Sequence, residues 1–478
     1  MTATLKKGLI EQLKAVVGTP GWLENDADLE PYLQEWRGLF RGQTPVLLMP
    51  ASKQETSAIL KICHEHEIAV VPQGGNTGLA GGAIPGLGER PEVLISMRRM
   101  KTIRDIDADN YTVTVEAGCI LENLQNTVSE QGFLFPLSLA AEGSCQIGGN
   151  ISTNAGGTNV LRYGNTRDLV LGLEVVLADG SVYEGLSGLR KDNTGYDLKQ
   201  LFIGAEGTLG IITAATLKLF PAPKSTATAL LAVSDPAAAV KLYGEARSRV
   251  GDDMVAFELM PRIAIDLVLE HIPNTRDPIN DAYPWYVLME LANTRSQNET
   301  DEVLTAFLGS CLEDGLIVDG IIANSEAQRK ELWYIRHVIS EAQKAAGGSI
   351  KHDISVPVSR MAEFLSEAEP LMQEILPGAR PVPFGHLGDG NLHYNISQPA
   401  GMDKKDFTDM WGAFSKVVHE LAISKGGSFS AEHGIGALKA AELARLSPAV
   451  DMQLMHALKQ VLDAKGIMNP GKVLNSSP

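Results

Sequence analysis

The sequence predicts an α+β protein of two or three domains, because helix and strand patterns alternate along most of a long chain. The 478 residues are 44% hydrophobic and 21% charged, which is typical of a globular protein with more than one buried core. Glycine is unevenly distributed. Of the 47 glycines, 23 lie in residues 71–215, where an even spread would place about 14, and this excess indicates backbone that approaches another group closely.

The first half of the chain is expected to hold a helix and irregular structure up to residue 45, and a regular α/β rhythm from Pro50 onward. Ser52 followed by Glu55 is a capping box, which predicts a helix to about residue 67. The β-branched run after it predicts a strand that Pro72 stops. The other strands predicted in this half are residues 92–97, 112–116, 169–177, 181–184 and 210–220.

The second half begins after residues 221–225 (PAPKS), a plausible domain boundary. Ser447 and Pro448 predict the start of a C-terminal helix, and Gly466 lies where that helix should end. The elements predicted between these points are strands at residues 226–233 and 285–291 and helices at residues 236–248, 298–314 and 325–345.

Charge and cysteine content exclude several classes of protein. The net charge of −17 argues against sequence-independent binding to nucleic acid or to an anionic membrane. No apolar run reaches the ~18 residues of a membrane-spanning helix, and the first residues show an amphipathic helical pattern without a secretory leader. The four cysteines have no CxxC spacing, so we expect reduced thiols and a cytoplasmic protein.

Three glycine-rich segments carry the first functional signal. They are residues 72–82 (PQGGNTGLAGG), 143–157 (GSCQIGGNISTNAGG) and 203–212 (IGAEGTLGII). Consecutive glycines let backbone N–H groups converge on an anion, although the first loop alone is equally well explained as a tight turn. Together the three segments indicate a large, flat, phosphorylated ligand. The GxGxxG spacing is missing after the first strand, so an NAD-binding Rossmann domain is disfavoured.

These segments resemble the FAD-binding domain of the vanillyl-alcohol-oxidase/PCMH flavoproteins over about residues 40–222, including residues 189–200 (LRKDNTGYDLKQ). The resemblance implies a PCMH-type FAD-binding domain at residues 1–222, with an N-terminal helical segment at 1–45. It implies an α+β substrate-binding (cap) domain at 223–425 and a small helical C-terminal segment at 426–478 that completes the active site. Some relatives tether FAD through a histidine in the first loop. This loop has Asn76 and Thr77 instead, so FAD should be non-covalent.

The resemblance also assigns cofactor-binding residues by motif. Those assigned to the phosphates and ribose of FAD are Pro72, Gly74, Gly75, Asn76, Thr77, Gly78 and Gly82. Those assigned to the isoalloxazine side are Pro136, Gly143, Ser144, Gly148, Asn150 and Gly156. Those assigned to the adenine side are Glu206, Gly207 and Ile212, and Asn469 of the C-terminal NPGK sequence is also assigned to the cofactor.

Three of the ten histidines lie in two unusual motifs, residues 386–393 (HLGDGNLH) and 432–436 (EHGIG). The Gly-Asp-Gly turn in the first motif can fold His386 and His393 onto one centre. Two imidazoles and the Glu432 carboxylate, with coordination positions left open, are ligands typical of a catalytic divalent metal. The residues alone leave open the alternative of unrelated histidines in turns.

These motifs, with Asn395 and NPGK, resemble the FAD-linked D-2-hydroxy acid dehydrogenases, among which the D-2-hydroxyglutarate dehydrogenases match best. The resemblance implies that His386, His393 and Glu432 bind the metal, with Zn²⁺ expected and Mn²⁺ or Fe²⁺ as alternatives. It implies that Asn395 binds the substrate and that His433 both binds the substrate and acts as the base. The expected reaction is metal-assisted oxidation of D-2-hydroxyglutarate to 2-oxoglutarate, with hydride transfer to FAD.

Cations indicate the size of the substrate. Arg336 and Ser340 lie four residues apart on one face of a predicted helix, and Lys351 follows in a predicted strand. Such charges are usually solvated, but the three residues match the family positions that bind the distal carboxylate of the substrate, which arginine can bind bidentately. Ser340 stands where the family has threonine, which leaves the size preference open.

Several alternatives remain at this point. A D-lactate or D-malate dehydrogenase of the same family is the first, and a non-catalytic flavoprotein subunit of a larger oxidase is a more distant one. Oxygen reactivity is open as well. The family implies an electron-transfer flavoprotein or a quinone pool as electron acceptor, and a homodimer.

Overall fold

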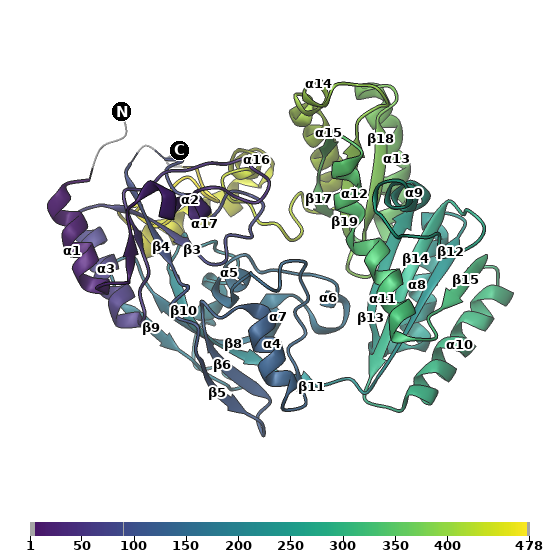
Figure 1. Ribbon diagram of the computed structural model, residues 1–478, viewed down its shortest axis with the longest axis horizontal. Coiled ribbons are helices and arrows are strands. Elements are labelled where there is room, and N and C mark those ends of the chain that lie inside the picture. Colours follow the sequence, from purple (N-terminus) through teal and green to yellow (C-terminus); the bar gives the residue numbers. More distant parts are fainter. Residues whose placement is uncertain (1–4, 89, 476–478) are drawn as a thin grey trace. The chain divides into compact units, whose positions relative to one another are not determined.

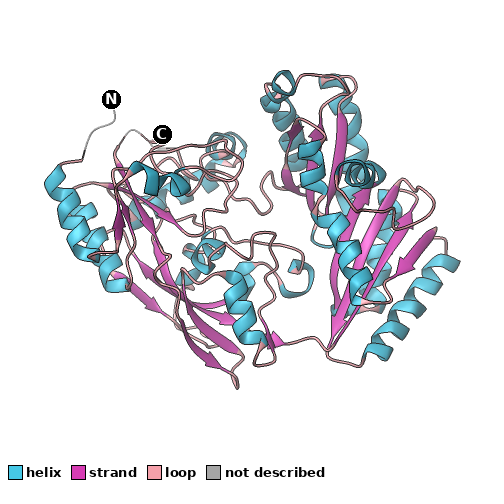
Figure 2. Cartoon of the chain, viewed as in Figure 1, coloured by secondary structure: helices cyan, strands magenta, loops and turns pink. Residues whose placement is uncertain are grey.

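The computed structural model describes residues 5–88 and 90–475, and the chain divides into two compact units (Figure 1). Unit 1 consists of Met1–Gly157, Gly164–Pro221 and Glu432–Pro478, and unit 2 consists of Thr158–Tyr163 and Ala222–Ala431. Each unit combines helices with its own β-sheets (Figure 2). None of the described helices has both the length and the apolar character that a membrane crossing requires.

The first sheet of unit 1 has the strand order β1-β2-β4-β3, in which β2, β4 and β3 are parallel. The predicted strand before the first glycine loop is found, but it runs through Pro72 to Gln73. Proline is compatible with this position because β3 is the last strand of the sheet, so its missing N–H breaks no central ladder. The elements of this part are α1 (Lys7–Val17), β1 (Trp22–Leu23), α2 (Asp26–Leu33), β2 (Leu47–Leu48), α3 (Lys53–Glu65), β3 (Ala69–Gln73) and β4 (Glu92–Ser96).

Helix α3 begins as the sequence predicts, with Ser52 accepting a hydrogen bond from the Glu55 N–H at 3.2 Å. The Glu55 carboxylate accepts the N–H of Ala51 rather than that of Ser52, so only one half of the capping box forms.

The second sheet of unit 1 is antiparallel with the order β5-β6-β10-β8-β9, and the strands predicted for it lie within two residues of their expected bounds. Its strands, with the β7–β11 pair, are β5 (Ile103–Asp107), β6 (Thr112–Glu116), β7 (Phe133–Leu134), β8 (Val170–Val176), β9 (Val182–Gly185), β10 (Ile211–Lys218) and β11 (Phe220–Pro221). The remaining helices of unit 1 are α4 (Leu121–Ser129), α5 (Ile147–Ser152), α7 (Thr166–Leu169), η1 (Leu198–Leu201), α16 (Ala440–Leu446) and α17 (Ala449–Leu462).

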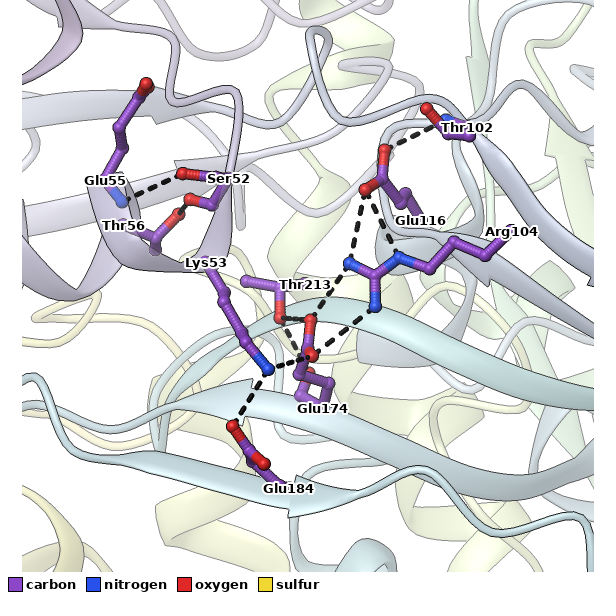
Figure 3. A network of polar contacts seen from close by, with 10 residues as sticks. All are labelled: Ser52, Lys53, Glu55, Thr56, Thr102, Arg104, Glu116, Glu174, Glu184 and Thr213. Atoms are coloured by element: carbon purple, nitrogen blue, oxygen red, sulfur yellow. Dashed lines mark hydrogen bonds and ion pairs between the residues drawn. The ribbon is translucent and has the colours of Figure 1, made fainter.

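A buried carboxylate ties α3 to this second sheet (Figure 3). Glu174 on β8 accepts hydrogen bonds from Lys53 at 2.9 Å and from Arg104 at 3.2 Å. It also accepts the hydroxyl of Thr213 at 2.8 Å, at a register irregularity between β8 and β10. Burial would raise the pKa of Glu174, but these hydrogen bonds outweigh burial and lower the pKa. The network therefore holds the start of β10 in place through Thr213, directly after Ile211 and Ile212.

Unit 2 is built on an eight-stranded antiparallel sheet with the order β15-β12-β14-β13-β18-β19-β16, in which β17 also pairs with β19. Helices α9, α11 and α12 pack on one face of the sheet, and α8, α10, α13 and α15 pack on the other (Figure 2). The strands are β12 (Ser225–Val233), β13 (Met254–Pro261), β14 (Trp285–Asn293), β15 (Asp319–Ile322), β16 (Ser349–Ile350), β17 (Asp353–Ser355), β18 (Arg380–His386) and β19 (Asn391–Ser397). The α-helices are α6 (Val160–Tyr163), α8 (Pro236–Arg249), α9 (Arg262–His271), α10 (Gln297–Glu313), α11 (Glu326–His337), α12 (Ile339–Ala345), α13 (Met361–Ile375), α14 (Lys404–Thr408) and α15 (Trp411–Ser424), and the short 3₁₀ helices are η2 (Gly251–Asp253), η3 (Val358–Arg360) and η4 (Leu387–Asp389).

The helix predicted at residues 325–345 is divided in two at Val338, whose ψ of 1° departs from helical geometry. Arg336 therefore lies in the last turn of α11, and Ser340 lies in the first turn of α12. Both helices still pack on the same face of the sheet.

We predict that the Glu174 network is the main polar contribution to the stability of unit 1. Replacing Glu174 with Ala leaves two cations without their shared buried partner and should lower the free energy of unfolding by about 3 kcal/mol. Glu184 is the control, because its side chain is 67% exposed although it also binds Lys53 at 2.9 Å. Glu184→Ala should change stability by less than about 1 kcal/mol. Urea denaturation followed by circular dichroism measures both, and equal effects would contradict the assignment.

Candidate active site

A pocket in unit 1 gathers all three glycine-rich segments around about 900 Å³ of empty space. The residues assigned to FAD from the sequence that line it are Pro72, Gly74, Gly75, Asn76, Thr77, Gly78, Gly82, Gly148, Asn150, Glu206, Gly207 and Ile212. His433, from the EHGIG motif, lines the same pocket. The pocket therefore joins the predicted base to most of the predicted cofactor residues.

The hydrogen-bonding groups of this pocket fit a dinucleotide with phosphates and ring N–H groups. The backbone N–H groups of residues 75–78 form no hydrogen bond with another described residue, so they remain available to an anion. The Oε1 atoms of Gln73 and Gln146 are buried and have no partner among the described residues. Buried polar atoms are normally paired, and both glutamines line the pocket, so a ligand with donor groups would satisfy them.

Close backbone packing explains two of the pocket glycines. A Cβ at Gly75 would overlap the carbonyl oxygen of Ser144, and one at Gly207, whose φ is +72°, would overlap the ring of Pro72. Gly78 is different, because nothing lies within 4 Å of the position that its Cβ would take. Its lack of a side chain is therefore not required by the packing of the protein itself.

Glu206 joins the third glycine segment to the EHGIG motif. Its carboxylate accepts the N–H groups of Ile435 and Gly436 at 2.7 and 2.8 Å. Burial raises the pKa of Glu206, and these two hydrogen bonds oppose the rise. Asn469 donates to the carbonyls of Gly82 and Glu206 at 2.9 and 2.7 Å. Both side chains therefore hold pocket-lining backbone in place.

Five of the residues assigned to FAD do not line the pocket: Pro136, Gly143, Ser144, Gly156 and Asn469. Ser144 lies behind Gly75, and Gly156 lies against the Glu432 carboxylate, which accepts the N–H of Gly157 at 2.7 Å. Sequence reasoning missed Gln73, Gln146 and Ala117, which line the pocket beside predicted residues. The available signal for the two glutamines was their position inside the glycine-rich segments 72–82 and 143–157.

A second polar cluster lies within unit 2, on the face of the sheet that α9, α11 and α12 cover. Side chains of directly paired residues point to the same face of a sheet, so the register decides its members. Glu258 pairs with His386, His393 pairs with Phe384, and Asp353 pairs with His393. The Gly390 turn, with φ of +83°, reverses the chain between β18 and β19 and leaves the His386 and His393 rings 5.8 Å apart.

Glu258 is the centre of this cluster and is completely buried. One carboxylate oxygen accepts His386 Nδ1 at 2.5 Å, and the other accepts Arg336 Nε at 2.7 Å. Burial would raise the pKa of Glu258, but its interactions with His386 and Arg336, including both hydrogen bonds, outweigh burial and lower the pKa to about 2. Glu258 was missed from sequence, although a lone acid in the apolar strand MVAFELMP was a visible signal.

Of the residues predicted to bind substrate, Arg336, Ser340, Lys351 and Asn395 lie in unit 2 as well, whereas His433 lies in unit 1. Asn395 donates to Gln343 Oε1 at 2.8 Å, and Gln343 in turn donates to the Ser397 hydroxyl at 3.3 Å, so α12 is tied to β19. Lys351 donates to the carbonyl of Ser340 at 3.5 Å. Arg336 is buried and its guanidinium lies 4.8 Å from the centre of the Phe384 ring.

Comparison with known proteins agrees with this architecture. Residues 44–185 match the family model described as an FAD binding domain, and residues 222–473 match the model described as the C-terminal domain of FAD linked oxidases. D-2-hydroxyglutarate dehydrogenase, mitochondrial, of Arabidopsis thaliana is 40% identical over 98% of this chain and 82% of its own length. The enzyme of the same name from Bos taurus is 42% identical over 95% of this chain and 81% of its own.

Solved structures extend the likeness of the fold. The structure of p-cresol methylhydroxylase with substrate bound superimposes with a TM-score of 0.76 over 99% of both chains at 17% identity. The chain therefore belongs to the FAD-linked oxidase family, in the group of FAD-dependent D-2-hydroxy acid dehydrogenases with a PCMH-type fold.

The comparison contradicts the expected location. The Arabidopsis and cattle relatives are both named as mitochondrial, so the expectation of a cytoplasmic protein is wrong. That expectation rested mainly on the cysteines, all four of which are indeed free and buried. Free thiols are typical of reducing compartments in general and do not distinguish one of them from another.

We predict that Gly78 and Gly75 differ in how substitution affects cofactor binding. Gly78→Ala should leave the stability of the apoprotein unchanged, because the added methyl meets no protein atom, but should weaken FAD binding at least tenfold if FAD fills that space. Gly75→Ala should lower both the stability of the apoprotein and the affinity for FAD, because it displaces the Ser144 backbone.

Thermal denaturation of the apoproteins and fluorescence titration with FAD separate the two effects. FAD affinity of Gly78→Ala equal to that of the wild type would show that the first glycine loop does not contact the cofactor at this position.

Proposed function

We propose that this enzyme oxidises D-2-hydroxyglutarate to 2-oxoglutarate. The proposal is supported by about 40% identity to D-2-hydroxyglutarate dehydrogenases over nearly the whole chain. The geometric observation that carries it is that Glu258 bonds both Arg336 and His386. A hydroxy acid with a second carboxylate needs a cation for that carboxylate close to the residues that act on its C2 hydroxyl, and Glu258 holds such a cation beside His386.

Arg336 is the proposed partner of the distal carboxylate. Its Nε is bonded to Glu258, so the side chain is held in one orientation. Neither of its Nη groups donates to another described residue. These two donors on one planar group match the two oxygens of a carboxylate, and Ser340, Lys351 and Asn395 are proposed to complete the substrate site.

The residues proposed for the metal fit a divalent ion. Two imidazoles on one Zn²⁺, with Zn–N bonds of about 2.0–2.1 Å, need ring centres roughly 5–6 Å apart, and those of His386 and His393 are 5.8 Å apart. Because His386 Nδ1 is bonded to Glu258, Nε2 is the ring nitrogen that we propose as the metal ligand. We propose His386, His393 and Glu432 as the ligands of Zn²⁺, with Mn²⁺ or Fe²⁺ as alternatives; when bound, the ion would lower the pKa of the C2 hydroxyl.

His433 is the proposed base, because it lines the pocket assigned to the flavin and an imidazole accepts a proton near neutral pH. FAD, bound without a covalent link, supplies the acceptor of the C2 hydride. Glu206 holds the backbone two residues after His433 and so keeps the imidazole at the pocket.

The electron acceptor and the assembly state complete the proposal. An electron-transfer flavoprotein or a quinone is proposed to reoxidise the flavin, and the chain is proposed to form a homodimer. Oxygen consumption during turnover that matched product formation would exclude this class of acceptor and indicate an oxidase.

We predict that Arg336 discriminates between substrates. Arg336→Gln should lower kcat/KM for D-2-hydroxyglutarate by 10- to 100-fold, since a hydrogen bond to a charged group contributes about 1.5–3 kcal/mol. Turnover of D-lactate, which has no distal carboxylate, should fall much less. Arg329→Gln is the control, because Arg329 lies in the same helix and binds Glu290 instead. Equal losses on both substrates would show that Arg336 does not bind the distal carboxylate.

We predict that metal content depends on His386. Purified wild-type protein should hold about one divalent ion per chain, and His386→Ala should retain less than a tenth of it, because one of two imidazole ligands is lost. Elemental analysis measures this directly. Unchanged metal content would remove His386 from the proposed ligand set.

A further inference from the structure

The buried carboxylate of Glu258 has no part in the reaction itself, yet it contacts two of the residues proposed to carry it. It lies on β13, His386 lies at the end of β18, and Arg336 lies in the last turn of α11. Three elements far apart in the sequence therefore meet at one side chain.

Stability alone does not account for an acid at this position. The neighbouring side chains on β13, Phe257 and Leu259, are buried and apolar, as are Ala256 and Met260 on the face of Glu258. Replacing a buried group of charges by apolar residues is often neutral or stabilising, so the group is not needed to hold the sheet together. What an apolar residue could not do is accept one hydrogen bond from an imidazole and one from a guanidinium.

We propose that Glu258 is a positioning residue that fixes the tautomer of His386 and the orientation of Arg336 at the same time. This inference rests on the proposed function. An ionised carboxylate only accepts hydrogen bonds, so His386 must carry a proton on Nδ1, and the neutral imidazole then has its lone pair on Nε2. The other oxygen holds Arg336 by Nε, and neither Nη group donates to another described residue.

The variant Glu258→Gln separates the two roles, because an amide has one acceptor and one donor group. Arg336 has only donors, so the amide oxygen of the glutamine must face it. The amide NH₂ then faces His386 Nδ1 and requires a lone pair there, which moves the imidazole proton to Nε2. The variant keeps the arginine in place and removes the ligand atom of the histidine.

Glu290→Gln is the matched control. Glu290 lies on the adjacent strand β14, is also largely buried, and accepts hydrogen bonds from Arg329 at 3.1 Å and Trp333 at 2.7 Å, both in α11. It therefore ties the same helix to the same sheet without contacting His386 or Arg336.

The experiment titrates Zn²⁺ into metal-stripped wild type, Glu258→Gln and Glu290→Gln, and measures urea unfolding of each. Glu258→Gln should bind Zn²⁺ 10- to 100-fold more weakly than the wild type, as expected for loss of the partner of a ligating histidine, while Glu290→Gln should bind it within about twofold. At saturating Zn²⁺, the ratio of kcat/KM for D-2-hydroxyglutarate to that for D-lactate should change less than about threefold in Glu258→Gln, because Arg336 keeps its acceptor.

Zn²⁺ affinity of Glu258→Gln equal to that of the wild type, or lowered equally in both variants, would overturn the positioning role while leaving the proposed function in place. A large fall in the ratio of kcat/KM for D-2-hydroxyglutarate to that for D-lactate in Glu258→Gln would overturn the separate anchoring of Arg336. A wild-type protein that binds no Zn²⁺ or does not oxidise D-2-hydroxyglutarate would overturn the proposed function itself.

Discussion

A carboxylate placed inside an apolar sheet needs a cation and hydrogen-bond donors from neighbouring elements, and Glu258 imposes this requirement on unit 2. Its two oxygens are bonded to His386 and Arg336, so strand β18 and helix α11 must lie against β13 in one arrangement. The turn after His386 then brings His393 beside it. The polar cluster on this face of the sheet, which holds Arg336, His386 and His393, follows from where this one charge is buried.

Unit 1 uses buried carboxylates for a related purpose, but around a pocket formed by backbone. Glu206 accepts two N–H groups of the segment that follows His433, and Glu174 fixes the strand that presents Ile211 and Ile212 to the pocket. The pocket's backbone N–H groups at residues 75–78 and two buried amide oxygens have no partner among the residues that the structure describes. These two carboxylates act on the pocket through the backbone and the strand that they hold in place.

Local patterns predicted the elements of the fold well wherever the physical cause was local. The strand after α3 and the strands predicted at residues 112–116, 169–177, 226–233 and 285–291 lie close to their expected bounds, whereas β5, β13, β18 and β19 were not predicted. The predictions fail where residues distant in the sequence determine the local structure. Strand β3 can contain Pro72 because β3 is the edge strand of its sheet, and no local sequence signal reveals that position. Val338 interrupts a periodic helix, although the residues around it favour continuation.

The sequence by itself determined the class of protein and the chemistry of its motifs, because glycine runs and paired histidines are local features that constrain backbone and ligand type directly. Only the tertiary structure decided which of those residues act together. It placed Gln73 and Gln146 in the pocket, kept Pro136 and Gly143 out of it, and joined Arg336 to His386 through Glu258. The physical reason is that strand register and helix packing determine which side chains meet, and both depend on residues far apart in the chain.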